Sequence, residues 1–176
     1  MRIITGTARG CRLETLPGDA TRPTAERVKE GLFSAIQFDL PGRRVLDLFA
    51  GSGQLGIEAL SRGAVSCVFV DQNKAATEII RRNLHAAKLA DKAQVLTTDA
   101  TGFLARTADT FDLVFLDPPY ADGLLLPALE AAAQKVAPGG LIVCESDEQV
   151  VLPETAGNLK LYRTYRYGRI HVTVYR

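Results

Sequence analysis

The sequence predicts a doubly wound α/β fold with a mostly parallel β-sheet. From residue 44 onward, short apolar runs rich in β-branched residues alternate with segments of helical periodicity, which is the pattern of strands buried between helices. The first of these runs leads into a glycine-rich turn. The chain has 176 residues, 47% hydrophobic and 23% charged, which fits one domain. We expect residues 1–40 to be an N-terminal extension that packs on a core of residues 41–176.

The extension is predicted to contain a β-hairpin and a helix. Residues 2–5 and 11–16 alternate as short strands would, on either side of a turn that runs from Gly6 to Gly10. The segment from Thr24 to Asp39 has helical periodicity, and Thr24 is a suitable N-cap. The apolar face of this helix carries Val28, Leu32, Ala35 and Ile36, and the polar face carries Glu26, Arg27, Lys29 and Glu30.

The core is predicted to contain a seven-stranded sheet. A turn at Gly139-Gly140 precedes the fifth strand. The segments 159–165 and 169–175 are separated by only three residues, too few for a crossover, so they form a hairpin and the last strand is antiparallel. The five earlier strands lie at 45–49, 66–70, 94–96, 111–116 and 141–144, and the helices between them lie near 53–62, 73–88, from about 100, and 122–136.

Several kinds of protein are excluded by what the sequence lacks. Cys11, Cys67 and Cys144 are widely spaced and form no C-x-x-C or Cys/His cluster, which predicts free thiols and no metal site. The N-terminus has no apolar leader, and no charge-free run is long enough to cross a bilayer. These observations predict a cytoplasmic protein without a membrane partner. Separately, we expect a monomer.

The glycine-rich turn indicates a binding site for an adenosine-containing cofactor. Gly51, Gly53 and Gly56 satisfy the pattern G-x-G-x-x-G between a strand and a helix. Asp71 lies twenty residues after Gly51, at the end of the next strand, where it can accept hydrogen bonds from ribose hydroxyls. Alternatively, these glycines serve only helix–strand packing and Asp71 merely ends a strand.

Asp47, four residues before Gly51, separates two classes of cofactor. In a nicotinamide site a pyrophosphate settles on the helix N-terminus, and a carboxylate beside it would repel that group. The same carboxylate suits a cationic ligand such as S-adenosylmethionine, which carries an α-ammonium and a sulfonium. The alternative is an ordinary acid at a strand end that is bonded to backbone N–H groups.

The tetrapeptide Asp117-Pro118-Pro119-Tyr120 follows the very apolar fourth strand. Consecutive prolines fix φ and hold the preceding residue extended, so that the Asp117 carboxylate and the nearby carbonyls point out of the sheet edge. Such rigid acceptors can grip an exocyclic amine of a heterocycle while Tyr120 stacks on the ring. A base presented in this way must first be flipped out of its helix. The alternative is a plain Pro-Pro turn with a core tyrosine.

Charge is unevenly distributed along the chain. Residues 1–44 have a net charge of +3, residues 45–158 of −7 and residues 159–176 of +5. The basic ends predict a polyanion-binding surface, since Lys and Arg that neutralise phosphates supply most sequence-independent nucleic-acid affinity. Near the C-terminus arginines alternate with Tyr162, Tyr165 and Tyr167, as on an RNA-contacting edge, and a plain amphipathic hairpin is the alternative. The candidate RNA-binding residues are Arg9, Arg12, Arg22, Arg27, Arg163, Arg166 and Arg169.

These motifs resemble those of known families. The glycine turn with Asp47, Asp71 and Asp99 is similar to that of class I S-adenosylmethionine-dependent methyltransferases, and the tetrapeptide is similar to their [DNS]-P-P-[YF] signature of amino-group methylation. More narrowly, the chain resembles the RsmD family, whose members methylate the N2 of one guanine in small-subunit ribosomal RNA. This resemblance rests on MRIITG at 1–6, RPTAERVKEGLF at 22–33, DLFAGSG at 47–53 and LGIEALSRGA at 55–64.

The resemblance implies a Rossmann-like methyltransferase fold and a role for each matching residue. Asp47, Gly51 and Gly53 would surround the methionine moiety, Asp71 the ribose and Asp99 the adenine. Gln54 departs from the small residue expected there, which affects the width of the turn. The segment after Val150 matches nothing in the family. The implied catalytic residues are Asp117, Pro118, Pro119 and Tyr120, and the further cofactor-binding residues are Phe49, Ala50, Gln72 and Ala100.

The resemblance also implies 16S ribosomal RNA or a small-subunit assembly as partner, and a reaction that needs no metal. Three rivals stay open. An adenine-N6 methyltransferase of DNA or RNA, or a protein-glutamine methyltransferase, shares the tetrapeptide. A nicotinamide oxidoreductase shares the glycines and leaves Asp47 and the tetrapeptide unexplained. A noncatalytic RNA-binding protein could keep the same scaffold.

Overall fold

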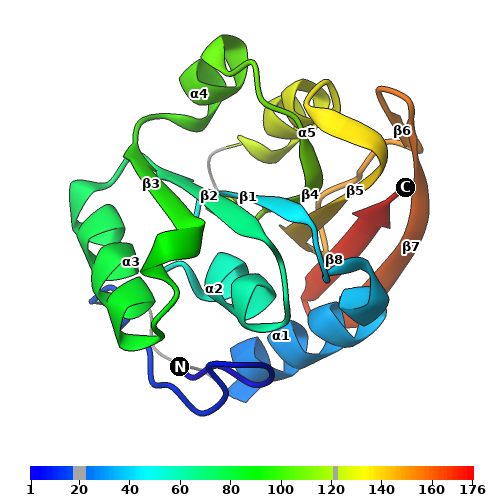
Figure 1. Cartoon of the computed structure of the whole chain (residues 1–176). Coiled ribbons are helices and arrows are strands. Elements are labelled where there is room, and N and C mark those ends of the chain that lie inside the picture. Colours follow the sequence, from blue (N-terminus) through cyan, green and yellow to red (C-terminus); the bar gives the residue numbers. More distant parts are fainter. Residues whose placement is uncertain (18–22, 121–122) are drawn as a thin grey trace.

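The computed structural model describes residues 1–17, 23–120 and 123–176, and its strands form one eight-stranded sheet in the order β3-β2-β1-β4-β5-β8-β7-β6 (Figure 1). The strands β1 to β5 are parallel, and β8 is antiparallel to both of its neighbours, β5 and β7. The expected mostly parallel sheet with an antiparallel last strand is confirmed. The strands are β1 (Arg44–Leu48), β2 (Ser66–Asp71), β3 (Ala93–Thr97), β4 (Phe111–Leu116), β5 (Val136–Asp147), β6 (Thr155–Ala156), β7 (Leu159–Tyr167) and β8 (Ile170–Tyr175).

Helices cover both faces of the sheet, as the doubly wound prediction requires (Figure 1). One apolar cluster joins α1, α2 and α3 to one face, and a second joins α4 and α5 to the other. Neighbouring strand residues such as Val45 and Leu46 belong to different clusters, because successive side chains of a strand point to opposite faces. The helices are α1 (Pro23–Ile36), α2 (Gln54–Ser61), α3 (Lys74–Ala86), α4 (Ala100–Arg106) and α5 (Leu125–Ala133), with short 3-10 turns η1 (Gln37–Asp39) and η2 (Ala90–Lys92).

The predicted N-terminal hairpin is present as a short antiparallel pairing around an isolated bridge between Arg2 and Arg12, without regular strands. The N–H of Ile3 donates to the carbonyl of Cys11 and that of Leu13 to the carbonyl of Met1, both at 2.9 Å, which extends the antiparallel pairing to both sides of the bridge. The next two N–H groups, of Ile4 and Thr5, donate to the carboxylate of Glu58 instead of a partner strand. The hairpin is therefore shorter than predicted: the pairing ends at Ile3, and the side chain of Glu58 on α2 holds the next two residues.

The extension shares a core with the sheet. Ile3, Leu13 and Val28 belong to the same buried cluster as residues of β1, β2 and β8, while the boundary at residue 40 stays a prediction. The helix α1 begins at Pro23, where proline is favoured, so Thr24 lies inside the first turn rather than at the N-cap. Lys29, expected on the polar face, is only 2% exposed.

The glycines at 139 and 140 lie inside β5 and do not form the predicted turn. The pairing of β4 with β5 shifts between Phe111 and Leu113, and Gly139 has a φ of 75°. A Cβ on Gly140 would lie 2.9 Å from the carbonyl oxygens of both Ala137 and Asp112, so this irregular part of the strand requires glycine. The sheet has eight strands where seven were predicted, because β6 is only two residues long and carries too little sequence pattern to be recognised.

The cysteines, the helices and the clusters of acidic, histidine and cysteine side chains bear on three expectations from the sequence. Cys11, Cys67 and Cys144 are free thiols. Within residues 1–17, 23–120 and 123–176, no helix has the length and apolar character needed to traverse a bilayer. The same ranges contain no group of three or more His, Cys, Asp or Glu side chains arranged to hold a metal ion.

Candidate active site at the carboxyl edge of the sheet

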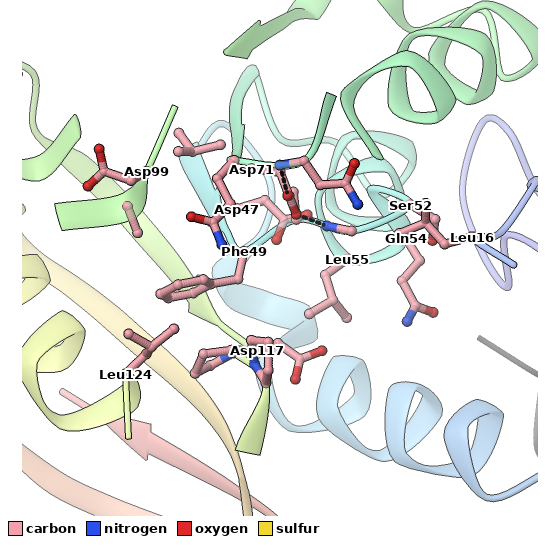
Figure 2. A pocket seen from close by; sticks show the side chains of 18 of the residues that line it. Leu16, Asp47, Phe49, Ser52, Gln54, Leu55, Asp71, Asp99, Asp117 and Leu124 are labelled. Carbon is pink, nitrogen blue, oxygen red and sulfur yellow. Dashed lines mark hydrogen bonds between the residues drawn. The ribbon is translucent and has the colours of Figure 1, made fainter. Parts of the chain in front are cut away.

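A cavity of about 790 Å³ lies where β1, β2, β3 and β4 end. Both motifs singled out in the sequence open onto it: Figure 2 shows Asp47 and Asp71 on one side and Asp117 on the other. Gly53, the N-cap residue of α2, is not among the residues that line the cavity. The predicted residues that line the cavity are Asp47, Phe49, Ala50, Gly51, Asp71, Gln72, Asp99, Ala100, Asp117, Pro118, Pro119 and Tyr120.

The glycine loop turns sharply through left-handed backbone conformations. Phe49, Gly51 and Gly53 have φ values of 64°, 55° and 78°. The N–H of Gly53 donates to the carbonyl of Ala50 at 2.7 Å, which closes the turn. The positive φ at Phe49 is costly for a residue with a Cβ, and such strain concentrates at functional sites. The glycine pattern of the sequence did not predict the positive φ of Phe49.

Asp47 is buried at the base of the cavity. Its Oδ2 accepts the N–H of Gly56 at 2.8 Å, so the structural role considered in the sequence is present together with the position on the cavity. Burial raises the pKa of Asp47 to about 7, opposed by the Gly56 hydrogen bond, and the neighbouring carboxylate of Asp71 raises it further. A cation that enters the cavity would favour the ionised form of this carboxyl group.

Asp71 and Asp99 also hold main-chain groups in place. Asp71 accepts the N–H of Gly51 through Oδ2 and that of Asn73 through Oδ1, both at 2.8 Å. Asp99 caps α4 by accepting the N–H of Gly102 at 2.6 Å. Each carboxylate oxygen has two lone pairs, so these bonds leave acceptor capacity toward the cavity.

The glycine loop has room for a ligand. A Cβ built on Gly51 would meet nothing within 4 Å, although the residue lines the cavity. Gln54, the departure noted in the sequence, also lines the cavity, and its Oε1 is buried with no hydrogen-bond partner among the residues that the structure describes. An unpaired buried acceptor is unusual, and a ligand donor would satisfy it.

The tetrapeptide forms the opposite wall. Tyr120 is 44% exposed, which contradicts the core-tyrosine alternative, and its Oη donates to Oε1 of Glu145 at 2.6 Å. Burial raises the pKa of Tyr120, and the charges of Glu145 and Asp117 raise it further. Burial also raises the pKa of Glu145, while the hydrogen bond from Tyr120 lowers it. Glu145 was not identified as a site residue from the sequence. The feature that could have indicated it is an acid directly after the apolar residues 141–144 of β5.

The N-terminal segment supplies part of the cavity wall that was not predicted. Met1, Thr15 and Leu16 line the cavity. The buried side chain of Asn83 on α3 connects this segment to the glycine loop. Its Oδ1 accepts the N–H of Glu14 at 2.8 Å, and its Nδ2 lies 3.0 Å from the carbonyl oxygen of Glu14 and 2.9 Å from that of Ser52.

The candidate RNA-binding arginines do not lie on one face. Arg163 and Arg166 are exposed on β7, opposite Val174 and His171 of β8, so the pleat places them on different faces of the sheet. Arg169, in the turn after β7, forms ion pairs with Asp147 at 3.7 Å and Glu148 at 3.4 Å. Arg22 lies outside the described residues, whereas Arg9, Arg12 and Arg27 are exposed.

The rings between these arginines differ in exposure. Tyr165 and Tyr167 are partly buried and pack against the core, and Arg163 lies 5.6 Å from the centroid of the Tyr165 ring. Tyr162 is 61% exposed, and Arg176 lies 5.0 Å from its ring centroid. Two of the three tyrosines are therefore held by the fold, and the expected row of exposed rings is not present.

Comparison with known proteins supports the resemblance read from the motifs. The whole chain, residues 1–176, matches the family described as Conserved hypothetical protein 95. YlbH of Bacillus subtilis (strain 168) is 43% identical over 100% of this chain and 98% of its own length. Ribosomal RNA small subunit methyltransferase D of Escherichia coli (strain K12) is 34% identical over 99% of this chain and 89% of its own length.

Solved structures show the same fold. The protein yhhF from Escherichia coli superposes with a TM-score of 0.87 at 34% identity, covering 99% of this chain and 96% of that one. A protein from Thermus thermophilus has a TM-score of 0.84 at 30% identity, with 99% and 98% covered. The chain therefore belongs to the family of Conserved hypothetical protein 95, the RsmD family, as its motifs predicted.

Proposed function

We propose that this protein transfers a methyl group from S-adenosylmethionine to the exocyclic N2 of a guanine in small-subunit ribosomal RNA. One observation carries the proposal: the cofactor-type glycine loop with Asp47 and the amine-gripping tetrapeptide open onto the same cavity. The name of the Escherichia coli relative, ribosomal RNA small subunit methyltransferase D, supports the RNA substrate.

The residues on the cofactor side fit S-adenosylmethionine. The buried acid Asp47 suits a cationic group, Gly51 leaves open space beside the loop, and Gln54 offers an unpaired acceptor. When bound, this cofactor supplies an electrophilic methyl group, so the reaction needs no metal. We assign Asp47, Phe49, Ala50, Gly51 and Gly53 to the methionine end, Asp71 and Gln72 to the ribose, and Asp99 and Ala100 to the adenine.

The tetrapeptide positions the acceptor. Asp117 and the main chain at Pro118 and Pro119 accept hydrogen bonds from the guanine amine, whose lone pair must leave conjugation with the ring before it can attack. Tyr120 stacks on the flipped base. Holding two reactants in line is worth up to roughly 7–11 kcal/mol in favourable systems. Asp117 is also the residue that takes the proton released by the amine.

Basic residues outside the cavity bind the RNA backbone in this proposal. Phosphate contacts from arginine give affinity without reading sequence. The substrate, 16S ribosomal RNA or a small-subunit assembly, places the enzyme in the cytoplasm, and a monomer suffices because one chain supplies both walls of the cavity. The assigned residues are Arg9, Arg12, Arg22, Arg27, Arg163, Arg166 and Arg169, some of them in the extension of residues 1–40.

The test is transfer of labelled methyl from S-adenosylmethionine to small-subunit RNA or particles from a strain that lacks this protein, with the product nucleoside mapped by mass spectrometry. We expect one N2-methylguanosine. Asp117→Ala should lower turnover by about 100-fold or more while the cofactor affinity measured by calorimetry stays unchanged. Asp91→Ala, which changes an exposed acid that is not among the residues lining the cavity, is the matched control.

Three outcomes contradict the proposal. Label on adenine or glutamine identifies another amino-group methyltransferase. RNA binding without any transfer identifies a noncatalytic protein. Near-normal turnover of Asp117→Ala rejects the role given to the tetrapeptide.

A further inference from the structure

A second, smaller cavity of about 250 Å³ lies beside the tetrapeptide. It shares Pro118, Pro119, Tyr120 and Leu124 with the larger cavity, so the two spaces meet at this wall. Most of its lining is apolar, including Val151, and the acidic side chain in the lining is that of Glu145. A largely apolar pocket with few polar groups suits a flat, partly apolar ligand whose orientation is set by those polar groups.

Glu145 stands at the same edge of the sheet as Asp117. Cys144 of β5 pairs with Leu116 of β4, so the next residue of each strand, Glu145 and Asp117, continues from adjacent positions. Tyr120 lines both cavities, and its hydroxyl is bonded to Glu145. The Tyr120 hydroxyl uses one acceptor position of Glu145, and a carboxylate has about four.

The chemistry of guanine fits two acceptors in this arrangement. Its Watson–Crick edge carries an N1–H donor directly beside the N2 amine. Adenine has the opposite pattern, with an N1 lone pair beside its N6 amine. A carboxylate that faces N1 therefore attracts guanine and repels adenine, and enzymes that flip a base read this edge by hydrogen bonds.

We propose that the smaller cavity holds the acceptor guanine and that Glu145 selects it by accepting the N1–H, while Asp117 holds the adjacent amine. This inference rests on the proposed function. A site built to hydrogen-bond a group discriminates strongly against an analogue that lacks it, because the polar group of the site is left unpaired. Glu145 is thus a specificity-determining residue, in addition to its contact with Tyr120.

A purely structural role for Glu145 predicts different behaviour. If Glu145 only held the Tyr120 ring, its loss would slow every substrate equally. Tyr120→Phe removes the hydroxyl of the pair and keeps the ring, so it isolates the positioning contribution. Glu148→Gln is a matched acid-to-amide control three residues away, since Glu148 lies on the surface and pairs with Arg169.

The experiment compares small-subunit RNA that carries either guanine or 2-aminopurine at the methylated position. The analogue keeps the reacting amine and presents an N1 lone pair in place of N1–H. We expect the wild-type protein to prefer guanine by about 100-fold or more in kcat/KM. Glu145→Gln should reduce this preference at least tenfold, because its amide can donate to N1 of the analogue. Tyr120→Phe and Glu148→Gln should leave the preference unchanged.

The inference is overturned if Glu145→Gln slows both substrates by the same factor, or if the wild-type protein accepts both equally. Either result leaves the proposed function standing, provided that the wild-type protein methylates the guanine RNA. If Glu145→Gln does not fold, Glu145→Ala replaces it, and the loss of the repelling carboxylate should again reduce the preference. An unchanged preference in that variant also overturns the inference.

Discussion

The two sides of the cavity are held in different ways. On the cofactor side Asp47, Asp71 and Asp99 each accept main-chain N–H groups of the glycine loop or of a neighbouring helix start. On the acceptor side Glu145 accepts from a side chain, the hydroxyl of Tyr120, and the surroundings include exposed apolar residues. The cofactor side is therefore held by bonds to the main chain, whereas the bond between Tyr120 and Glu145 joins two side chains, one after the end of β4 and one on β5.

The cofactor side is also tied to the N-terminal segment by buried polar groups. Glu58 of α2 accepts the N–H groups of Ile4 and Thr5, at 2.8 and 3.0 Å, and the Nε of Arg62 at 2.8 Å. Lys29 lies 3.5 Å from the same carboxylate. One buried acid therefore holds two main-chain groups of the N-terminal segment, in addition to the bonds that Asn83 makes to Glu14.

The largest expected effect is on stability, from Glu58→Ala. This change leaves the N–H groups of Ile4 and Thr5 without their acceptor and removes the carboxylate that pairs with Lys29, whose Nζ still donates to the carbonyl of Arg2 at 2.7 Å. Breaking a buried ion pair by removing one partner costs about 3–5 kcal/mol. We expect the free energy of unfolding, measured in urea, to fall by that amount. Glu78→Ala, an exposed acid on α3, should change it by less than about 0.5 kcal/mol. A loss below about 1 kcal/mol for Glu58→Ala would mean that the N-terminal wall is held by other contacts.

The next prediction is that Asp47→Asn changes stability and cofactor binding in opposite directions. Folding raises the pKa of this acid from 3.8 to about 7, so the folded protein keeps a proton that the unfolded chain loses. The stability linked to this group is complete below pH 3.8 and is lost as the pH rises to 7. Asp47→Asn should therefore raise the melting temperature of the ligand-free protein at pH 8 while it weakens cofactor binding.

Calorimetry with S-adenosylhomocysteine, which keeps the α-ammonium group, checks the binding half of this prediction. The ammonium favours ionised Asp47, so the wild-type affinity should rise from pH 6 to pH 8, by at most about tenfold per pH unit. In Asp47→Asn the affinity should be about tenfold or more lower at pH 8 and should lose this rise. A pH profile identical in both proteins would show that Asp47 does not face the ammonium.

The difference between the two sides also explains how much the sequence could reveal. The cofactor side follows local rules: glycines at a sharp turn and acids at strand ends are close in sequence to the N–H groups they hold. The pair of Tyr120 with Glu145 joins residues 25 positions apart, through the pairing of β4 with β5. No local pattern specifies such a partner.

The errors in the predicted fold have the same origin. Ile4 and Thr5 alternate like a strand, yet their N–H groups donate to Glu58, more than fifty residues away in sequence. Lys29 has the sequence signature of a surface residue, yet it is buried beside that acid. Gly139 and Gly140 indicate a turn, and only the register of β4 shows that they form an irregular stretch of β5. Local periodicity predicts elements, and long-range partners decide these exceptions.

A substitution at Asn83 tests whether the N-terminal wall contributes to cofactor binding only, or to RNA binding as well. Asn83→Ala removes hydrogen bonds to Glu14 and to the carbonyl of Ser52, and the buried groups left unpaired should cost about 1–3 kcal/mol of stability. We expect the KM for S-adenosylmethionine to rise while the KM for RNA stays unchanged. Arg82→Ala breaks only the exposed ion pair with Glu14 and should have little effect on either KM. Equal increases in both KM values would show that this wall also serves the acceptor side.

The smallest effect concerns the side from which RNA approaches. Arg27 is exposed on α1 near Ala25, which lines the larger cavity, whereas Arg169 is on the acceptor side and is already paired with Asp147 and Glu148. A free guanidinium that meets a phosphate releases a counterion, and losing one such contact lowers the salt dependence of log K by about 0.9 on duplex or 0.7 on single strands. We expect Arg27→Gln to reduce the steepness of the fall of log K with log salt concentration by about this amount. Arg169→Gln should reduce it less. The reverse order, measured by filter binding from about 50 to 200 mM salt, would mean that the RNA displaces the two acids from Arg169 and enters over the acceptor side.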